Sequence, residues 1–126
     1  MKQENLILDK SFEFALDVIQ LYNIHINQKE YVLSKQFLRS GTAIGALIEE
    51  AQGAHSKKDF IAKMEIAYKE ARETKYWFRL LERSQLVKAD YHLYIIKSDE
   101  ILKLLTAIIR SSKQNYITEK TTITIK

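Results

Sequence analysis

The sequence contains no proline in 126 residues. Proline ends helices because its ring removes a backbone N–H and clashes with the preceding turn. Only 3 glycines are present, which is too few for the frequent tight turns of β-sandwiches and β-barrels. The chain is therefore expected to form long helices joined by few connections.

Apolar residues recur at alternating spacings of three and four in several stretches of the chain, which is the pattern of amphipathic helices. This pattern predicts helices over about residues 5–26, 31–54, 57–84 and 91–113. The connections between them are short, and short connections favour antiparallel neighbours. The predicted fold class is all-α: an up-down-up-down antiparallel four-helix bundle formed by residues 1–115 as one domain.

The same periodicity predicts which residues face the core. In the first helix these are Leu8, Phe12, Ala15, Ile19, Tyr22 and Ile26. In the third helix they are Phe60, Met64, Ala67, Ala71, Thr74, Phe78 and Leu81. Residues 116–126 are rich in Thr and Ile and lack a helical period. They are expected to form a short non-helical C-terminal tail, either flexible or added as a strand.

Two glycines, Gly41 and Gly45, lie four residues apart inside the second predicted helix. A glycine in a helix interior costs about 1 kcal/mol relative to alanine. The pair therefore indicates helix packing at which another backbone comes close. A phosphate-binding loop is not expected here, because the glycines lie in mid-helix and no Gly-Lys-Ser/Thr follows.

The charge balance is basic, with 20 Lys and Arg against 16 Asp and Glu and a net charge of +4. Such a balance is compatible with an anionic partner. Helical periodicity gathers basic residues, together with Tyr68, on one side of the third helix. Arginine and tyrosine can bind phosphates and stack on bases. The candidate nucleic-acid-binding residues are Lys69, Arg72, Lys75, Arg79 and Arg83. The alternative is a solvated face of ion pairs.

A further side of the third helix carries Ile66, Trp77 and Leu80. Apolar and aromatic residues outside the core often mark protein interfaces. These three residues are therefore the candidate oligomer interface. The alternative is that the third helix is central and broadly buried.

No motif for catalysis or metal binding is present in the sequence. There is no cysteine, and His25, His55 and His92 form neither a His-x-x-x-His pair nor a Glu-x-x-His motif. Glu70 and Glu73 share a side of a helix, but solvated charge is the favoured interpretation. We predict no enzymatic activity, no cofactor and no metal. A secretory leader and a membrane-length apolar stretch are also lacking, so the expected compartment is the cytoplasm.

Residues 35–51 (KQFLRSGTAIGALIEEA), 56–61 (SKKDFI) and 67–81 (AYKEARETKYWFRLL) resemble the signatures of a bacterial family. This is the family of proteins encoded in 23S rRNA intervening sequences, also labelled S23 ribosomal proteins. The resemblance extends over about residues 5–113. It implies a cytoplasmic homopentamer of four-helix bundles without established catalytic residues. It also implies kinship with the accessory variability determinant of diversity-generating retroelements, a basic pentamer that binds nucleic acid and a reverse transcriptase.

The favoured hypothesis is a non-enzymatic oligomeric bundle that binds RNA or DNA through the basic face of the third helix. The alternative is a protein-interaction or assembly module that does not bind nucleic acid. Its partner would be a second copy, a reverse transcriptase or another protein. An enzyme with a metal or small-molecule site in the bundle core is the least favoured possibility.

Overall fold

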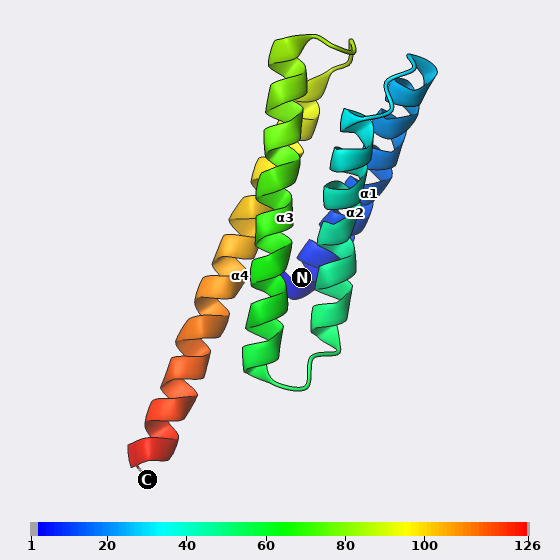
Figure 1. The fold of residues 1–126 in the computed structure, drawn as a ribbon. Helices are drawn as coiled ribbons and strands as arrows, with labels where there is room; N and C mark the ends of the chain where they lie inside the picture. The colour runs from blue at the N-terminus through cyan, green and yellow to red at the C-terminus, as the bar shows by residue number, and fades with distance from the viewer. Residues whose placement is uncertain (1–2, 126) are drawn as a thin grey trace.

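The computed structural model describes the backbone of residues 3–125 and the side chains of residues 6–121. The described residues form four α-helices: α1 (Gln3–Asn27), α2 (Leu33–Gln52), α3 (Lys57–Ser84) and α4 (Tyr91–Ile125). Successive helices run in opposite directions (Figure 1), and each helix packs on two others in the cyclic order α1, α2, α3, α4. The predicted all-α, up-down-up-down four-helix bundle is confirmed.

The core is centred on Phe78 of α3, which contacts one aromatic ring from each of the other helices. Its ring centroid lies 6.2 Å from that of Phe14 on α1, 5.7 Å from that of Phe37 on α2 and 5.6 Å from that of Tyr94 on α4. Phe14, Phe37 and Phe78 are at most 2% exposed. Offset and edge-on ring pairs at these distances are favourable beyond their burial. Phe78 therefore connects all four helices.

The prediction of which face of α1 lies in the core is wrong, because each buried residue precedes a predicted one by one position. Phe12 and Ile19 were expected in the core, but they are 62% and 42% exposed. The buried residues of α1 are instead Ile7, Ser11, Phe14, Val18, Leu21 and His25. Because α1 carries apolar residues on more than one face, its periodicity fits two rotations about the helix axis. Packing against α2 selects the second.

The two glycines of α2 face α1. A Cβ atom on Gly41 would lie 2.8 Å from one γ-methyl group of Val18, whereas a Cβ on Gly45 would lie 3.4 Å from the backbone oxygen of Ser11. Val18 is fully buried, so its methyl groups occupy the space that a side chain at position 41 would need. The missing side chain at position 41 lets α1 approach α2 with Val18 pointing inward.

The prediction of a non-helical tail is wrong for residues 116–125, because α4 continues to Ile125. In Figure 1 the end of α4 runs past the connection between α2 and α3. Thr118 Oγ1 donates to the Gln114 carbonyl, and Glu119 pairs with Lys57 of α3 at 2.9 Å. No proline or glycine interrupts this segment, and such contacts override the low helix propensity of Thr and Ile.

A polar network crosses the end of the bundle at which α1 meets α4. His25 of α1 is fully buried; its Nδ1 lies 2.7 Å from Glu30 Oε1, and its Nε2 lies 2.9 Å from Tyr91 Oη. Tyr91 Oη donates to the Val87 carbonyl at 2.7 Å. The network therefore joins α1 and the α1–α2 connection to the start of α4 and the loop before it.

Glu30 also accepts hydrogen bonds from the backbone N–H groups of Val32, Leu33 and Ser34 at the start of α2. Burial alone would raise the pKa of the Glu30 carboxyl, but the bond to His25 and these three N–H groups outweigh burial and lower that pKa. Burial, followed by the nearby Glu30 carboxylate, raises the pKa of Tyr91 to about 12. The folded state therefore favours an ionised Glu30 and a neutral Tyr91.

The glycine contact predicts opposite outcomes for two similar substitutions. Gly41→Ala should destabilise the protein by about 1–3 kcal/mol, because the stiff, buried Val18 cannot move away from the new methyl group. Gly45→Ala should be neutral or stabilising by up to about 1 kcal/mol, since alanine favours the helix and makes only ordinary contacts. Urea unfolding of both variants measures the difference. Equal effects of the two substitutions would contradict this packing.

The Tyr91 hydroxyl predicts a loss of stability in alkali. Its neutral form is favoured in the folded state, so this contribution is complete below pH 10, the ordinary pKa, and is lost as pH rises towards about 12. Tyr91→Phe should cost about 1–3 kcal/mol at neutral pH, because His25 and the Val87 carbonyl lose a partner. Above pH 10 the difference in free energy of unfolding between wild type and Tyr91→Phe should then become smaller, by at most about 1.4 kcal/mol per pH unit. Urea unfolding over this pH range measures the difference, and a constant difference contradicts the prediction.

Candidate nucleic-acid interface

The five basic residues predicted on α3 do not share one environment. Lys69, Arg72, Arg79 and Arg83 are exposed, whereas Lys75 is partly buried between α3 and α4. The Lys75 ammonium lies 2.7 Å from Asp99 Oδ1 of α4. An ion pair at this distance neutralises Lys75, so it is less suited to bind phosphate than the other four.

The exposed cations of α3 lack carboxylate partners among the described residues. Lys69, Arg79 and Arg83 make no ion pair with the side chains of residues 6–121, and Arg72 contacts the aromatic ring of Tyr68. Its guanidinium carbon lies 6.0 Å from the ring centroid, and Nη1 lies 3.4 Å from the Tyr68 hydroxyl. From Lys69 to Arg83 the helix rises by about 21 Å. These cations therefore form a long stripe that is not neutralised internally.

A groove between α3 and α4 adjoins this stripe. Its volume is about 590 Å³, and it is lined by Glu65, Tyr68, Lys69, Thr106, Ile109, Arg110, Lys113, Gln114 and Ile117. Lys113 pairs with Glu65 at 3.2 Å, whereas Arg110 is exposed and has no ion pair with a described residue. The sequence does not predict Arg110 as part of this site, because its position beside Lys69 depends on the relative placement of two helices.

A second, open cavity lies further along α3. It measures about 630 Å³ and is lined by Tyr76, Arg79, Leu80, Glu82, Arg83 and Ser84. Tyr76 is 53% exposed, and its ring centroid lies 5.2 Å from that of Trp77. Two hollows of the α3 surface thus place a tyrosine beside basic side chains.

On the opposite flank of α3, two glutamates form ion pairs with an arginine of α2. Arg39 Nη1 lies 2.9 Å from Glu70 Oε2, and Nη2 lies 2.6 Å from Glu73 Oε2. Trp77 Nε1 donates to the same Glu73 oxygen at 3.1 Å. Burial alone would raise the pKa of the Glu73 carboxyl, but the Trp77 and Arg39 donors outweigh it and lower that pKa. Glu70 and Glu73 therefore bind Arg39.

The three residues predicted as the oligomer interface also differ in their exposure. Ile66 and Leu80 are 47% and 37% exposed, whereas Trp77 is partly buried and packs against the core. The more exposed apolar surface lies on α1, where Phe12 (62%), Leu16 and Ile19 form a stripe. The helical period of α1 predicts Phe12 and Ile19 in the core and therefore does not indicate this surface. We call Phe12, Leu16 and Ile19 the α1 stripe.

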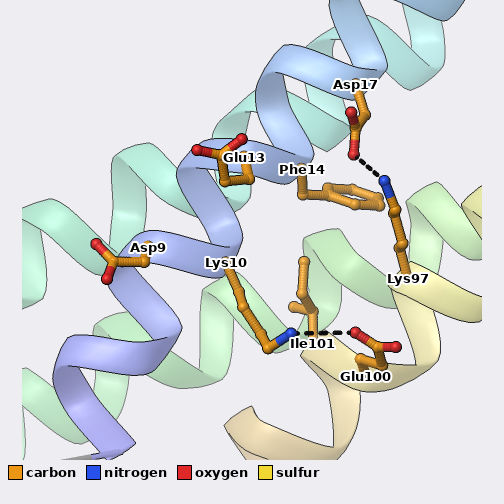
Figure 2. A pocket seen from close by; sticks show the side chains of 8 residues that line it. All are labelled: Asp9, Lys10, Glu13, Phe14, Asp17, Lys97, Glu100 and Ile101. Atoms are coloured by element: carbon orange, nitrogen blue, oxygen red, sulfur yellow. Dashed lines mark hydrogen bonds and ion pairs between the residues drawn. The ribbon is translucent and has the colours of Figure 1, made fainter. Parts of the chain in front are cut away.

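A smaller pocket of about 190 Å³ lies in the seam between α1 and α4. Figure 2 shows its two cross-helix ion pairs, Lys10 with Glu100 at 3.3 Å and Lys97 with Asp17 at 2.6 Å. Phe14 and Ile101, both buried, lie between these pairs (Figure 2). Because these carboxylates are already paired and the residues between them are apolar, the pocket is interpreted as part of the packing between α1 and α4 and not as a ligand site.

The histidines do not converge. His25 belongs to the buried network, and His55 lies 3.7 Å from Asp59 with 90% of its side chain exposed. Within the part of the chain that the structure describes, no three His, Cys, Asp or Glu residues are placed to hold a metal ion. None of the described helices is both long and apolar enough to cross a membrane.

These observations define a small antiparallel four-helix bundle protein in which a flank of α3 carries exposed cations without carboxylate partners among the described side chains. Comparison with known families makes the assignment specific, because the model of the 23S rRNA-intervening sequence protein family matches residues 3–107. The chain belongs to this family, as the motifs in α2 and α3 had indicated. The family is not a recognised class of enzyme.

A solved relative has the same fold. It is described as a protein with unknown function from the S23 ribosomal protein family of Bacteroides thetaiotaomicron VPI-5482. The two sequences are 50% identical over 86% of this chain and 99% of the other, with a TM-score of 0.83. No curated protein matches the chain.

Proposed function

We propose that this protein is a non-enzymatic bundle that binds RNA or DNA through the exposed flank of α3 and the adjoining edge of α4. The observation that carries the proposal is a set of exposed cations without carboxylate partners among the described residues. We call this set the basic face: Lys69, Arg72, Arg79, Arg83 and Arg110. Lys75, which was predicted with them, is excluded because it pairs with Asp99.

The basic face holds more positive charge than the chain as a whole. Its five cations carry +5, whereas the net charge of the protein is +4. The rest of the chain is therefore close to neutral. Cations that remain un-neutralised attract phosphates and release the counterions condensed on nucleic acid.

Salt dependence is the first test of this proposal. If all five cations contact phosphates of a single strand, log K should fall against log salt concentration with a slope of about −3.5. This corresponds to a loss of affinity of about 100-fold between roughly 50 and 200 mM salt. The Lys69→Gln/Arg72→Gln double variant should bring the slope to about −2.1. Fluorescence anisotropy with a labelled RNA at several salt concentrations measures both slopes.

Lys35→Gln/Lys88→Gln is the matched control, because it removes two exposed lysines that lie outside the basic face and lack ion pairs among the described residues. It should leave the slope near −3.5. A wild-type slope near zero, or an equal change in the control, would contradict binding through the basic face.

Self-assembly is a second proposed property, and it is favoured by the α1 stripe. We propose that copies of the chain associate through this stripe, with the homopentamer implied by the family resemblance as the expected form. Burial of apolar surface is the main favourable term in such association. Binding to a reverse transcriptase or to another protein, and a cytoplasmic location, stay predictions from the sequence.

Assembly predicts a mass that depends on the α1 stripe. Light scattering of the wild type should give about 74 kDa, five copies of 14.8 kDa. Phe12→Gln/Leu16→Gln should give 14.8 kDa particles of unchanged helicity, because glutamine is compatible with the helix but not with an apolar interface. Ile66→Gln/Leu80→Gln tests the other apolar surface. A wild-type mass of 14.8 kDa would rule out assembly, and a lower mass only for the Ile66/Leu80 variant would place the interface on α3.

A further inference from the structure

The groove between α3 and α4 is not lined by cations alone. Tyr68, Ile109 and Ile117 form its apolar part, and Lys69, Arg110 and Lys113 belong to the same lining. Ile117 is 57% exposed. Phosphate oxygens require donors and positive charge, so an exposed apolar surface is unnecessary in a site that binds phosphate only. The apolar part indicates that a second chemical group enters the groove.

Nucleobase faces are the apolar surfaces of a nucleic acid. In a duplex these faces are stacked inside, and a protein meets the backbone and the base edges. In a single strand an unpaired base can turn out and stack on aromatic or apolar side chains while the backbone follows a basic groove. The α3–α4 groove has both features, and its volume of about 590 Å³ is within the ordinary range of about 300–1,000 Å³ for ligand sites.

The combination occurs twice along α3. Tyr68 lies in the groove with Lys69, and Tyr76 lies in the second cavity with Arg79 and Arg83. The two tyrosines are eight residues apart, which is about 12 Å along the helix. Two aromatic positions on one basic stripe are suited to consecutive parts of a flexible strand.

The charges of the groove favour a polyanion. Glu65 is the one carboxylate in the groove lining, and it pairs with Lys113. Lys69 and Arg110 make no ion pair with a described residue, and Arg72 lies against the Tyr68 ring. An anionic strand in the groove would therefore meet cations without displacing an internal carboxylate from them.

We propose that the groove and the neighbouring Tyr76 cavity bind single-stranded nucleic acid, with unpaired bases against Tyr68, Ile117 and Tyr76 and the backbone along the basic face. This inference rests on the proposed function and specifies the form of nucleic acid that is bound. RNA and DNA strands share the required chemistry, and strands of both kinds belong in the test.

The test compares an RNA strand of about 12 nucleotides, the DNA strand of the same sequence and the corresponding RNA duplex. Wild type should bind at least one of the strands more tightly than the duplex. Tyr76→Leu should weaken strand binding by about 5- to 150-fold, the range for loss of one stacked base, and leave duplex binding unchanged. For Tyr76→Leu the slope of log K against log salt concentration should also stay at the wild-type value, because base stacking releases no counterions. Tyr31→Leu is the matched control, since Tyr31 is 49% exposed on the α1–α2 connection.

Tyr68→Leu should have the same effect as Tyr76→Leu, and Tyr68→Phe should bind like wild type because the ring is kept. Tyr68 is partly buried, so Ile117→Gln provides a test of the groove that does not alter the core. Trp77 is the single tryptophan of the chain and lies beside Tyr76. Its fluorescence should change when a strand binds to wild type but not when it binds to the Tyr76→Leu variant.

Two outcomes separate the failure of this inference from the failure of the proposed function. Equal, salt-steep binding of strand and duplex that is indifferent to Tyr76→Leu and Ile117→Gln would overturn the single-strand inference and leave the basic face intact. No salt-dependent binding of any of the three nucleic acids would overturn both.

Discussion

The close approach of α1 to α2 at Gly41 determines how the rest of the bundle is arranged. A Cβ atom at this position would lie 2.8 Å from a methyl group of Val18, so the absent side chain is the space into which Val18 packs. With Val18 inward, Phe14 of the same helix face reaches Phe78 at the centre of the core. The same rotation turns Phe12 outward. The exposure of the α1 stripe is thus a consequence of a glycine on a different helix.

The basic face keeps its charge because the carboxylates that make ion pairs among the described residues bind other cations. On the α2 side of α3, Glu70 and Glu73 bind Arg39. In the seam between α1 and α4, Asp17 and Glu100 bind lysines. Single exposed pairs of this kind contribute little to stability, but together they determine which cations are neutralised. The outer flank of α3 is left with arginines and a lysine that pair with no carboxylate among the side chains of residues 6–121.

Much of the basic face could be predicted from the sequence, since the 3.6-residue period alone places four of its cations on the outer half of α3: Lys69, Arg72, Arg79 and Arg83. Lys75 lies on the same flank, but Asp99 of α4 neutralises it. Arg110 could not be predicted to join the set, because its position depends on how α4 is placed along α3. The groove, which needs side chains from both helices, has the same dependence.

Four helices in antiparallel order follow from local sequence signals, because the missing prolines, the short connections and the apolar spacing act within a few residues of each position. Packing between the helices fixes three features that those local signals leave open. The rotation of α1 depends on the space that Val18 occupies beside Gly41. The extension of α4 to Ile125 is accompanied by the ion pair between Glu119 and Lys57 of α3. Which cations are neutralised depends on the carboxylates that neighbouring helices place beside them. Each of these outcomes depends on contacts between residues far apart in the chain, and helical periodicity within a single segment carries no information about such contacts.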